Sequence, residues 1–212
     1  MPLAERHPLY YFHGFASAIP RDFADSPKIT EVAAWAGRRG RDFRPRNIDY
    51  RKAPAHARTL LDEVDGSVRD VVFCGASMGG WFARIMQLLL ARERPGLPIA
   101  AVVFNPAFNL AEFSHLLEGP QLNYVTQQSF DWTPTHSSRL VELETAVEYR
   151  ADLPFWVYVD RDDEVIDSAL SERFHRDFAR LRVFDGGSHT FEHTREALKD
   201  FDDACWPPPS QC

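Results

Sequence analysis

Cysteine is scarce in this chain of 212 residues, which contains only Cys74, Cys205 and Cys212. Three thiols spaced this far apart match neither a disulfide framework nor the ligand spacing of a zinc site. We therefore expect neither a disulfide framework nor a zinc site.

Long apolar runs and an excess of basic charge are also absent. The most apolar stretch, residues 81–90, is far shorter than the 18 or so residues that span a bilayer, and it carries Arg84 and Gln87. The first residues lack the basic and apolar regions of a signal peptide. Lysine and arginine total 24 against 31 acidic residues, a net charge of −7, whereas nucleic-acid-binding domains are normally basic. We expect a cytoplasmic protein with no membrane span, no nucleic-acid partner and a small-molecule substrate.

Hydrophobic residues make up 44% of the chain, enough for a sizeable core in one domain covering residues 1–212. Short β-prone runs alternate with segments of helical periodicity, which predicts an α/β fold with a mostly parallel central sheet flanked by helices. We expect strands at residues 9–12, 43–48, 70–74, 100–104, 154–159 and 182–184. We expect helices at residues 27–37, 53–64, 78–92, 168–179 and 190–201.

Residues 106–150 interrupt this alternation. They mix Pro, Asn, Gln, Ser and Thr with scattered aromatic residues and contain one helical piece at residues 140–149. About 45 residues of this composition are too few for an independent domain. We interpret the segment as a cap-like insertion over the edge of the sheet.

A glycine-rich turn follows the predicted strand at residues 70–74 and precedes a predicted helix. Its sequence, GASMGG at residues 75–80, fits the G-x-S-x-G nucleophile elbow in the required strand–turn–helix context. Gly75 and Gly79 lack side chains, so the backbones on either side of Ser77 can pass closely. We predict that Ser77 is a nucleophile and that the Met78 N–H stabilises an oxyanion. The alternative is a tight turn with an incidental serine.

A serine hydroxyl needs a base to become nucleophilic. In the fold that carries this elbow, the partners follow in the order serine, acid, histidine. His189 lies directly after the last predicted strand, where a loop can bring an imidazole over Ser77, and we predict that it is the base. His193 is the alternative. His175 falls in a predicted surface helix and is interpreted as solvated.

The acid is expected in the loop after the predicted strand at residues 154–159. We favour Asp163 because it precedes the apolar pair Val165 and Ile166, where the chain turns towards the next helix. It would hold the neutral tautomer of His189 and stabilise the imidazolium. Asp160 is the alternative, and the other carboxylates of the loop are interpreted as solvated: Asp162, Glu164 and Asp167.

A second oxyanion donor is expected in the loop after the first predicted strand. Gly14 lets the chain turn there, so that the N–H of Phe15 faces Ser77. His13 is expected to pack and hydrogen-bond behind this loop. Ser17 is predicted either to support the loop or to contact substrate.

Aromatic residues are candidates for an acyl pocket. Phe15, Trp81, Phe108 and Trp132 are predicted to line it, although the helical spacing of Trp81 fits the core equally well. Residues 38–52 carry a local charge of +5 from six arginines and one lysine against two aspartates. This stretch could hold the phosphates of coenzyme A, but we favour a solvated strand edge.

Taken together, the motifs resemble a known family. The resemblance runs from about residue 9 to residue 201 and is carried by residues 10–17 (YYFHGFAS), 75–80 (GASMGG), 103–107 (VFNPA), 163–165 (DEV) and 186–191 (GGSHTF). In these segments the chain resembles the small bacterial α/β-hydrolase esterases of the UPF0227 (YqiA/YcfP) family. One departure is Asp160, which stands where many such proteins have glycine.

The resemblance implies an α/β-hydrolase fold with a reduced cap and hydrolysis of carboxylic esters, or of thioesters such as acyl-CoA, without metal or cofactor. It places Ser77, Asp163 and His189 on the family's triad positions, and Phe15 and Met78 on its oxyanion positions. We therefore predict a serine hydrolase that forms an acyl-enzyme. The alternatives are an acyltransferase or C–C bond hydrolase on the same fold, and a hydrolase-fold binding protein without catalysis.

Overall fold

The computed structural model describes residues 5–204 and residue 206, so Cys205, Cys212 and the first four residues lie outside the described part. The strands are β1 (Pro8–Phe12), β2 (Asp42–Arg46), β3 (Val71–Ala76), β4 (Ile99–Phe104), β5 (Gly119–Leu122), β6 (Ser129–Trp132), β7 (Phe155–Asp160) and β8 (Arg180–Phe184). The α-helices are α1 (Pro27–Arg38), α2 (Ala53–Asp62), α3 (Met78–Glu93), α4 (Leu110–Phe113), α5 (Pro134–Thr145), α6 (Ser168–His175) and α7 (Thr194–Asp203). Short 3₁₀ helices are η1 (Phe23–Asp25), η2 (Tyr50–Lys52) and η3 (Ser114–Leu117).

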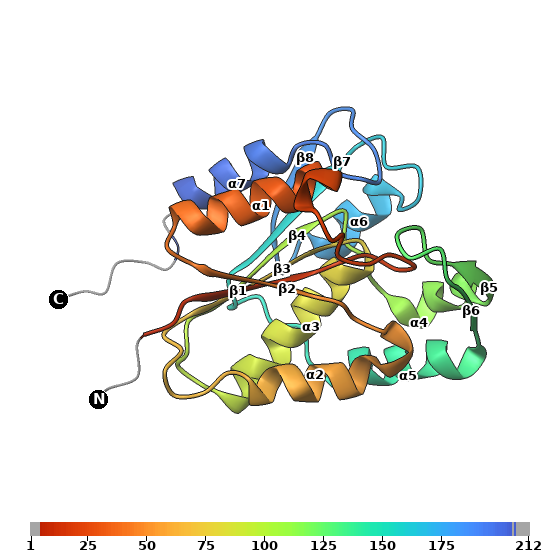
Figure 1. Cartoon of the computed structure of the whole chain (residues 1–212), viewed down its shortest axis with the longest axis horizontal. Helices are drawn as coiled ribbons and strands as arrows, with labels where there is room; N and C mark the ends of the chain where they lie inside the picture. Colours follow the sequence, from red (N-terminus) through yellow and green to blue (C-terminus); the bar gives the residue numbers. More distant parts are fainter. Residues whose placement is uncertain (1–4, 205, 207–212) are drawn as a thin grey trace.

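Six parallel strands form the central sheet in the order β2-β1-β3-β4-β7-β8. Figure 1 shows α1 and α7 on one face and α2 and α3 on the other. Successive side chains of β3 alternate between the two cores: Val71 and Phe73 belong to the cluster with α2 and α3, and Val72 and Cys74 to the cluster with α1 and α7. Burial on both faces explains why the inner strands β1, β3, β4 and β7 are largely apolar, whereas the edge strands β2 and β8 carry arginines and are partly exposed.

The strand order places a crevice next to β1. From β1 the chain runs to the edge strand β2 and then returns to β3 on the other side of β1. The connections that leave β1 and β3 therefore diverge. In open parallel sheets the crevice at the carboxyl ends of such strands is where ligands bind. The loop at residues 13–17 and the turn at Ser77 flank this crevice.

The expected sheet flanked by helices is confirmed, and each expected strand lies within two residues of the observed one. Two helix predictions were wrong at one end. The last helix begins at Thr194 rather than residue 190, because residues 188–193 form a loop in which Phe191 has a φ of 61°. The helix from Ser168 ends at His175 rather than residue 179.

Residues 106–150 fold into α4, η3, a two-stranded hairpin of β5 and β6, and α5. The hairpin was not predicted because its sequence has few β-branched residues. The helix expected at residues 140–149 instead begins at Pro134, where Thr133 and His136 form a reciprocal capping box. Figure 1 shows α4, β5 and β6 grouped beyond one end of the central sheet.

Helix α3 runs through the middle of the molecule and is buried although it contains Arg84 and Gln87. The Arg84 guanidinium donates to Gln87 Oε1 and to the Arg150 carbonyl, and it lies 4.4 Å from the centroid of the Phe155 ring. Burial lowers its pKa to about 10. These contacts replace part of the water that the charge loses, while Arg84 Nε is buried without a hydrogen-bond partner among the described residues. None of the helices in the described residues is both long and apolar enough to cross a bilayer.

Candidate active site

Ser77 occupies the turn between β3 and α3, with a φ of 55° and a ψ of −127°. Two glycines make this turn possible. A Cβ added to Gly75 would lie 2.3 Å from the Gly79 carbonyl oxygen, and one added to Gly79 would lie 2.1 Å from the Phe12 carbonyl oxygen. Backbone segments therefore touch at both positions and leave no room for a side chain. The strained turn places the Ser77 side chain at the edge of a cavity.

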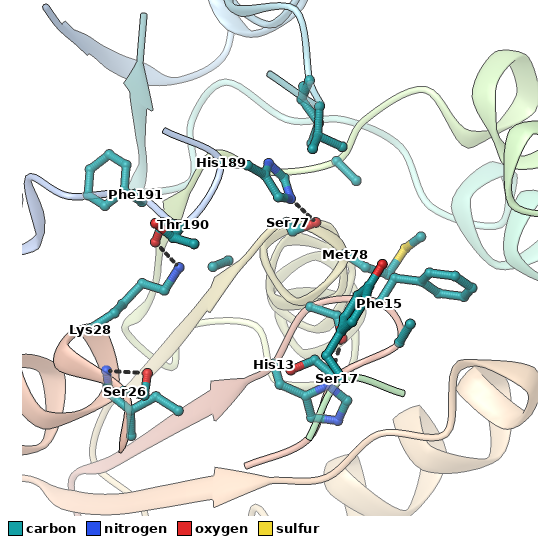
Figure 2. A pocket seen from close by; sticks show the side chains of 18 of the residues that line it. His13, Phe15, Ser17, Ser26, Lys28, Ser77, Met78, His189, Thr190 and Phe191 are labelled. Carbon is teal, nitrogen blue, oxygen red and sulfur yellow. Dashed lines mark hydrogen bonds between the residues drawn. The ribbon is translucent and has the colours of Figure 1, made fainter. Parts of the chain in front are cut away.

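His189, in the loop between β8 and α7, reaches over this turn. Its Nε2 lies 3.1 Å from Ser77 Oγ (Figure 2). Its Nδ1 lies 3.0 Å from both carboxylate oxygens of Asp163. The Asp163 side chain is only 1% exposed and accepts hydrogen bonds from the amides of Val165 and Ile166. A carboxylate beside Nδ1 favours the tautomer with the hydrogen on Nδ1, which leaves Nε2 as an acceptor that faces Ser77 Oγ.

The loop after β1 passes directly beside Ser77. A Cβ added to Gly14 would lie 3.3 Å from Ser77 Cβ and 3.7 Å from Ser77 Oγ. The next amide, that of Phe15, donates to no carbonyl among the described residues. The amide of Met78 is the first of α3 and has no acceptor within the helix. Figure 2 shows both residues next to Ser77, as an oxyanion site requires.

Asp160 and His193, the alternative acid and base, are brought together with each other and not with Ser77. Asp160 is fully buried and accepts from His193 Nδ1 at 2.7 Å and from the amides of Glu192 and Ser188. The His193 ring stacks on Phe184. Asp160 therefore fastens both ends of the loop that carries His189.

Asn105 and Glu164 hold the same loop, although Glu164 was interpreted as solvated and Asn105 was not predicted to have a role at the site. Asn105 Nδ2 donates to the Ser188 carbonyl at 2.8 Å, and its Oδ1 accepts from the Asp160 amide at 2.8 Å. Glu164 accepts from the His189 amide at 2.9 Å. The signal for Asn105 was its position directly after the buried strand β4, at the carboxyl edge of the sheet.

A large cavity of about 1440 Å³ opens above Ser77 and His189. Ser17 and Phe108, two of the predicted substrate contacts, line it together with Phe15 and Met78. Its walls come from the loops after β1 and β7, from α1, from the loop that carries His189, and from the first half of residues 106–150.

The sequence of residues 8–203 identifies the family of this chain. A model of the uncharacterised protein family UPF0227 matches residues 8–203. The chain belongs to UPF0227. No curated protein matches its sequence.

Solved structures with the α/β-hydrolase fold resemble this UPF0227 protein. Est1E from Butyrivibrio proteoclasticus aligns with a TM-score of 0.68 at 18% identity, over 95% of this chain and 89% of that one. The esterase domain of a Rhodothermus marinus protein gives 0.61 at 15%, over 96% and 87%. Alpha/beta hydrolase domain-containing protein 10 from mouse gives 0.61 at 16%, over 93% and 89%. At these identities the likeness confirms the predicted α/β-hydrolase fold.

Trp81 and Trp132 do not line the cavity of the UPF0227 protein, contrary to their prediction as substrate contacts. Both side chains are 2% exposed and belong to the core between α3 and residues 106–150. Trp81 donates to Glu144, and Trp132 donates to Ser137. Trp132 packs edge-on against Phe15, with the ring centroids 5.0 Å apart, so it supports the loop at residues 13–17 that passes beside Ser77.

Two further histidines are structural. His13 accepts from the Ile48 amide and contacts the Gly14 carbonyl, which places it behind the loop as expected. His175, expected to be solvated, is instead 3% exposed and sits among phenylalanines, one of which is Phe108. Burial lowers the pKa of each imidazole to about 4. The periodicity of α6 did not reveal that its His175 face packs under β7.

Lys28 is a cavity residue that the sequence did not single out. Its ammonium donates to the carbonyl of Thr190, the residue after His189, at 2.6 Å. Burial lowers its pKa to about 8, against the opposing effect of nearby carboxylates. In Figure 2, Lys28 and Thr190 lie on one side of Ser77, and Phe15 and Met78 lie on the other.

Proposed function

We propose that this protein is a serine hydrolase that cleaves carboxylic esters through an acyl-enzyme. The observation that carries the proposal is the hydrogen-bonded series Ser77–His189–Asp163 at the edge of a large cavity. The amides of Phe15 and Met78 beside Ser77, which have no hydrogen-bond acceptor among the described residues, support it. Residues 1–212 form one hydrolase domain in this proposal, with residues 106–150 as its cap.

The reaction follows from these positions. Ser77 Oγ attacks the ester carbonyl carbon while its proton passes to His189 Nε2, and the amides of Phe15 and Met78 bind the oxyanion. The ester C–O bond then breaks, and the leaving alkoxide takes the proton from His189. Water attacks the acyl-enzyme by the same route, which releases the acid and restores Ser77. Asp163 stays ionised and orients the imidazole throughout.

The arginine-rich stretch argues for oxygen esters over acyl-CoA thioesters. Arg39, Arg41, Arg44, Arg46 and Arg51 each form an ion pair with a carboxylate. None of residues 38–52 lines the cavity. No arginine of residues 38–52 is therefore available at the cavity to bind the phosphates of coenzyme A. This supports the interpretation of the stretch as a solvated strand edge.

Product analysis tests hydrolysis against acyl transfer. We expect p-nitrophenyl butyrate, incubated with the protein and added butanol, to yield butyric acid as the main product, because the open cavity admits water to the acyl-enzyme. A matched incubation without protein gives the background. Butyl butyrate in excess of butyric acid would assign the protein to the acyltransferases and contradict the proposal.

A further inference from the structure

Exposed large hydrophobic side chains gather at the mouth of the cavity. Among the described residues these side chains are Leu116 (70% exposed), Leu122 (44%), Tyr124 (74%), Val125 (46%) and Val165 (66%). All of them except Leu122 line the cavity above Ser77. Exposed apolar side chains that gather in one place mark a surface that binds an apolar group.

The apolar mouth is held in a fixed position relative to Ser77. Leu116 lies in η3, Tyr124 and Val125 lie in the turn between β5 and β6, and Val165 follows Asp163 in the loop after β7. The Tyr124 amide donates to the Ala16 carbonyl at 2.9 Å, which joins the β5–β6 hairpin to the loop at residues 13–17 beside Ser77. Asn123 Nδ2 likewise donates to the Ser17 carbonyl at 2.7 Å.

An apolar wall continues from the mouth into the cavity. It is lined by Phe108, Phe113, Leu117, Ile166 and Leu170, in addition to Phe15 and Met78 beside Ser77. On the other side of Ser77 the lining is mixed, with the polar groups of Lys28 and Thr190 next to the Phe191 ring. The cavity, at about 1440 Å³, exceeds the range of about 300–1,000 Å³ that is usual for small-ligand pockets.

We infer that the substrate carries a long aliphatic acyl chain, which runs from Ser77 along this wall to the mouth formed by Leu116, Tyr124, Val125 and Val165. The leaving group then lies on the other side of Ser77, next to the polar groups of Lys28 and Thr190. The inference rests on the proposed function, since it assigns the two halves of the cavity to the two parts of an ester. The acyl chain covers this apolar wall and displaces water from it, which favours binding.

A chain-length series tests the inference. With p-nitrophenyl esters from acetate to decanoate, kept below the concentrations at which they aggregate, we expect kcat/KM to rise about two- to fourfold for each CH₂ that reaches apolar wall. Leu116→Ser and Tyr124→Ser should each lower the decanoate-to-acetate ratio of kcat/KM about tenfold, as expected when a contact with the far end of the chain is lost. Both side chains are exposed, so neither substitution removes a core contact.

Leu122→Ser is the matched control, because Leu122 is an exposed leucine of the same segment that does not line the cavity. Its decanoate-to-acetate ratio should equal that of the unaltered protein. A series that peaks at acetate, or equal ratios for Leu116→Ser and Leu122→Ser, would overturn the inference. If acetate hydrolysis still required Ser77 in that case, the proposed function would stand and only the acyl-chain assignment would fail.

Discussion

Substituting Ser77 with alanine should lower kcat for p-nitrophenyl butyrate by about 10⁵- to 10⁶-fold, the scale of loss when a nucleophile of this kind is removed. Alanine has no oxygen to form the acyl-enzyme, so His189 and Asp163 are left without a reaction to assist. The remaining cavity and amides should still give about 10³- to 10⁴-fold acceleration over water. Steady-state hydrolysis measured at saturating ester checks this.

The control for this substitution is Ser129→Ala. Ser129 is exposed on β6 and does not line the cavity, so its replacement should leave kcat unchanged. Thermal unfolding should show that Ser77→Ala is as stable as the unaltered protein, because the only side chain among the described residues to which the hydroxyl hydrogen-bonds is that of His189. A folded Ser77→Ala variant that retained a tenth or more of the activity would remove Ser77 from the mechanism.

Asp163→Asn should lower kcat by about 10³- to 10⁴-fold while the fold is retained. An amide beside His189 Nδ1 can donate its own hydrogen, which favours the tautomer with the proton on Nε2. That nitrogen then cannot accept the proton of Ser77. The loss should appear in kcat, measured with the same ester and at a pH where the unaltered protein is fully active.

Asp160→Asn is the matched comparison, because Asp160 accepts hydrogen bonds from the loop that carries His189 and not from His189 itself. An asparagine has one acceptor oxygen in place of two, so at least one of these bonds is lost. We expect the free energy of unfolding to fall by about 1–3 kcal/mol, with a loss in kcat far smaller than that of Asp163→Asn. Urea unfolding together with kinetics measures both. The opposite ranking of the two variants in kcat would make Asp160 the acid.

The sequence was most informative where local chemistry determines the structure. The turn at Ser77 requires glycines, because backbone segments touch there and leave no room for a side chain. Residues 75–80, between a buried strand and a helix, therefore revealed it. The order serine, acid, histidine narrowed the partners to a few positions, because parallel strands bring their following loops to one edge. The positions of β3 and β4 followed from continuous apolar runs, which burial on both faces demands.

Predictions that depended on tertiary packing were the ones that failed. The spacing of Trp81 fits a core position and a pocket position equally, and only the docking of residues 106–150 decides between them. His175 has a polar side chain, yet it is buried among aromatic rings contributed by distant segments. From the sequence, Asp160 was an alternative to Asp163 as the acid. Its hydrogen-bond partners lie in the loop at residues 186–193, and the sequence alone does not show that this loop packs against it.

Labelling with a fluorophosphonate tests the central claim most directly, since such a probe reacts with a serine only when a base and an oxyanion site activate it. The protein would be incubated with the probe, digested and mapped by mass spectrometry. We predict a label on Ser77 that is absent from Ser77→Ala and strongly slowed in Asp163→Asn. An unlabelled protein, or a label on any serine other than Ser77, would contradict the assignment of Ser77 as an activated nucleophile.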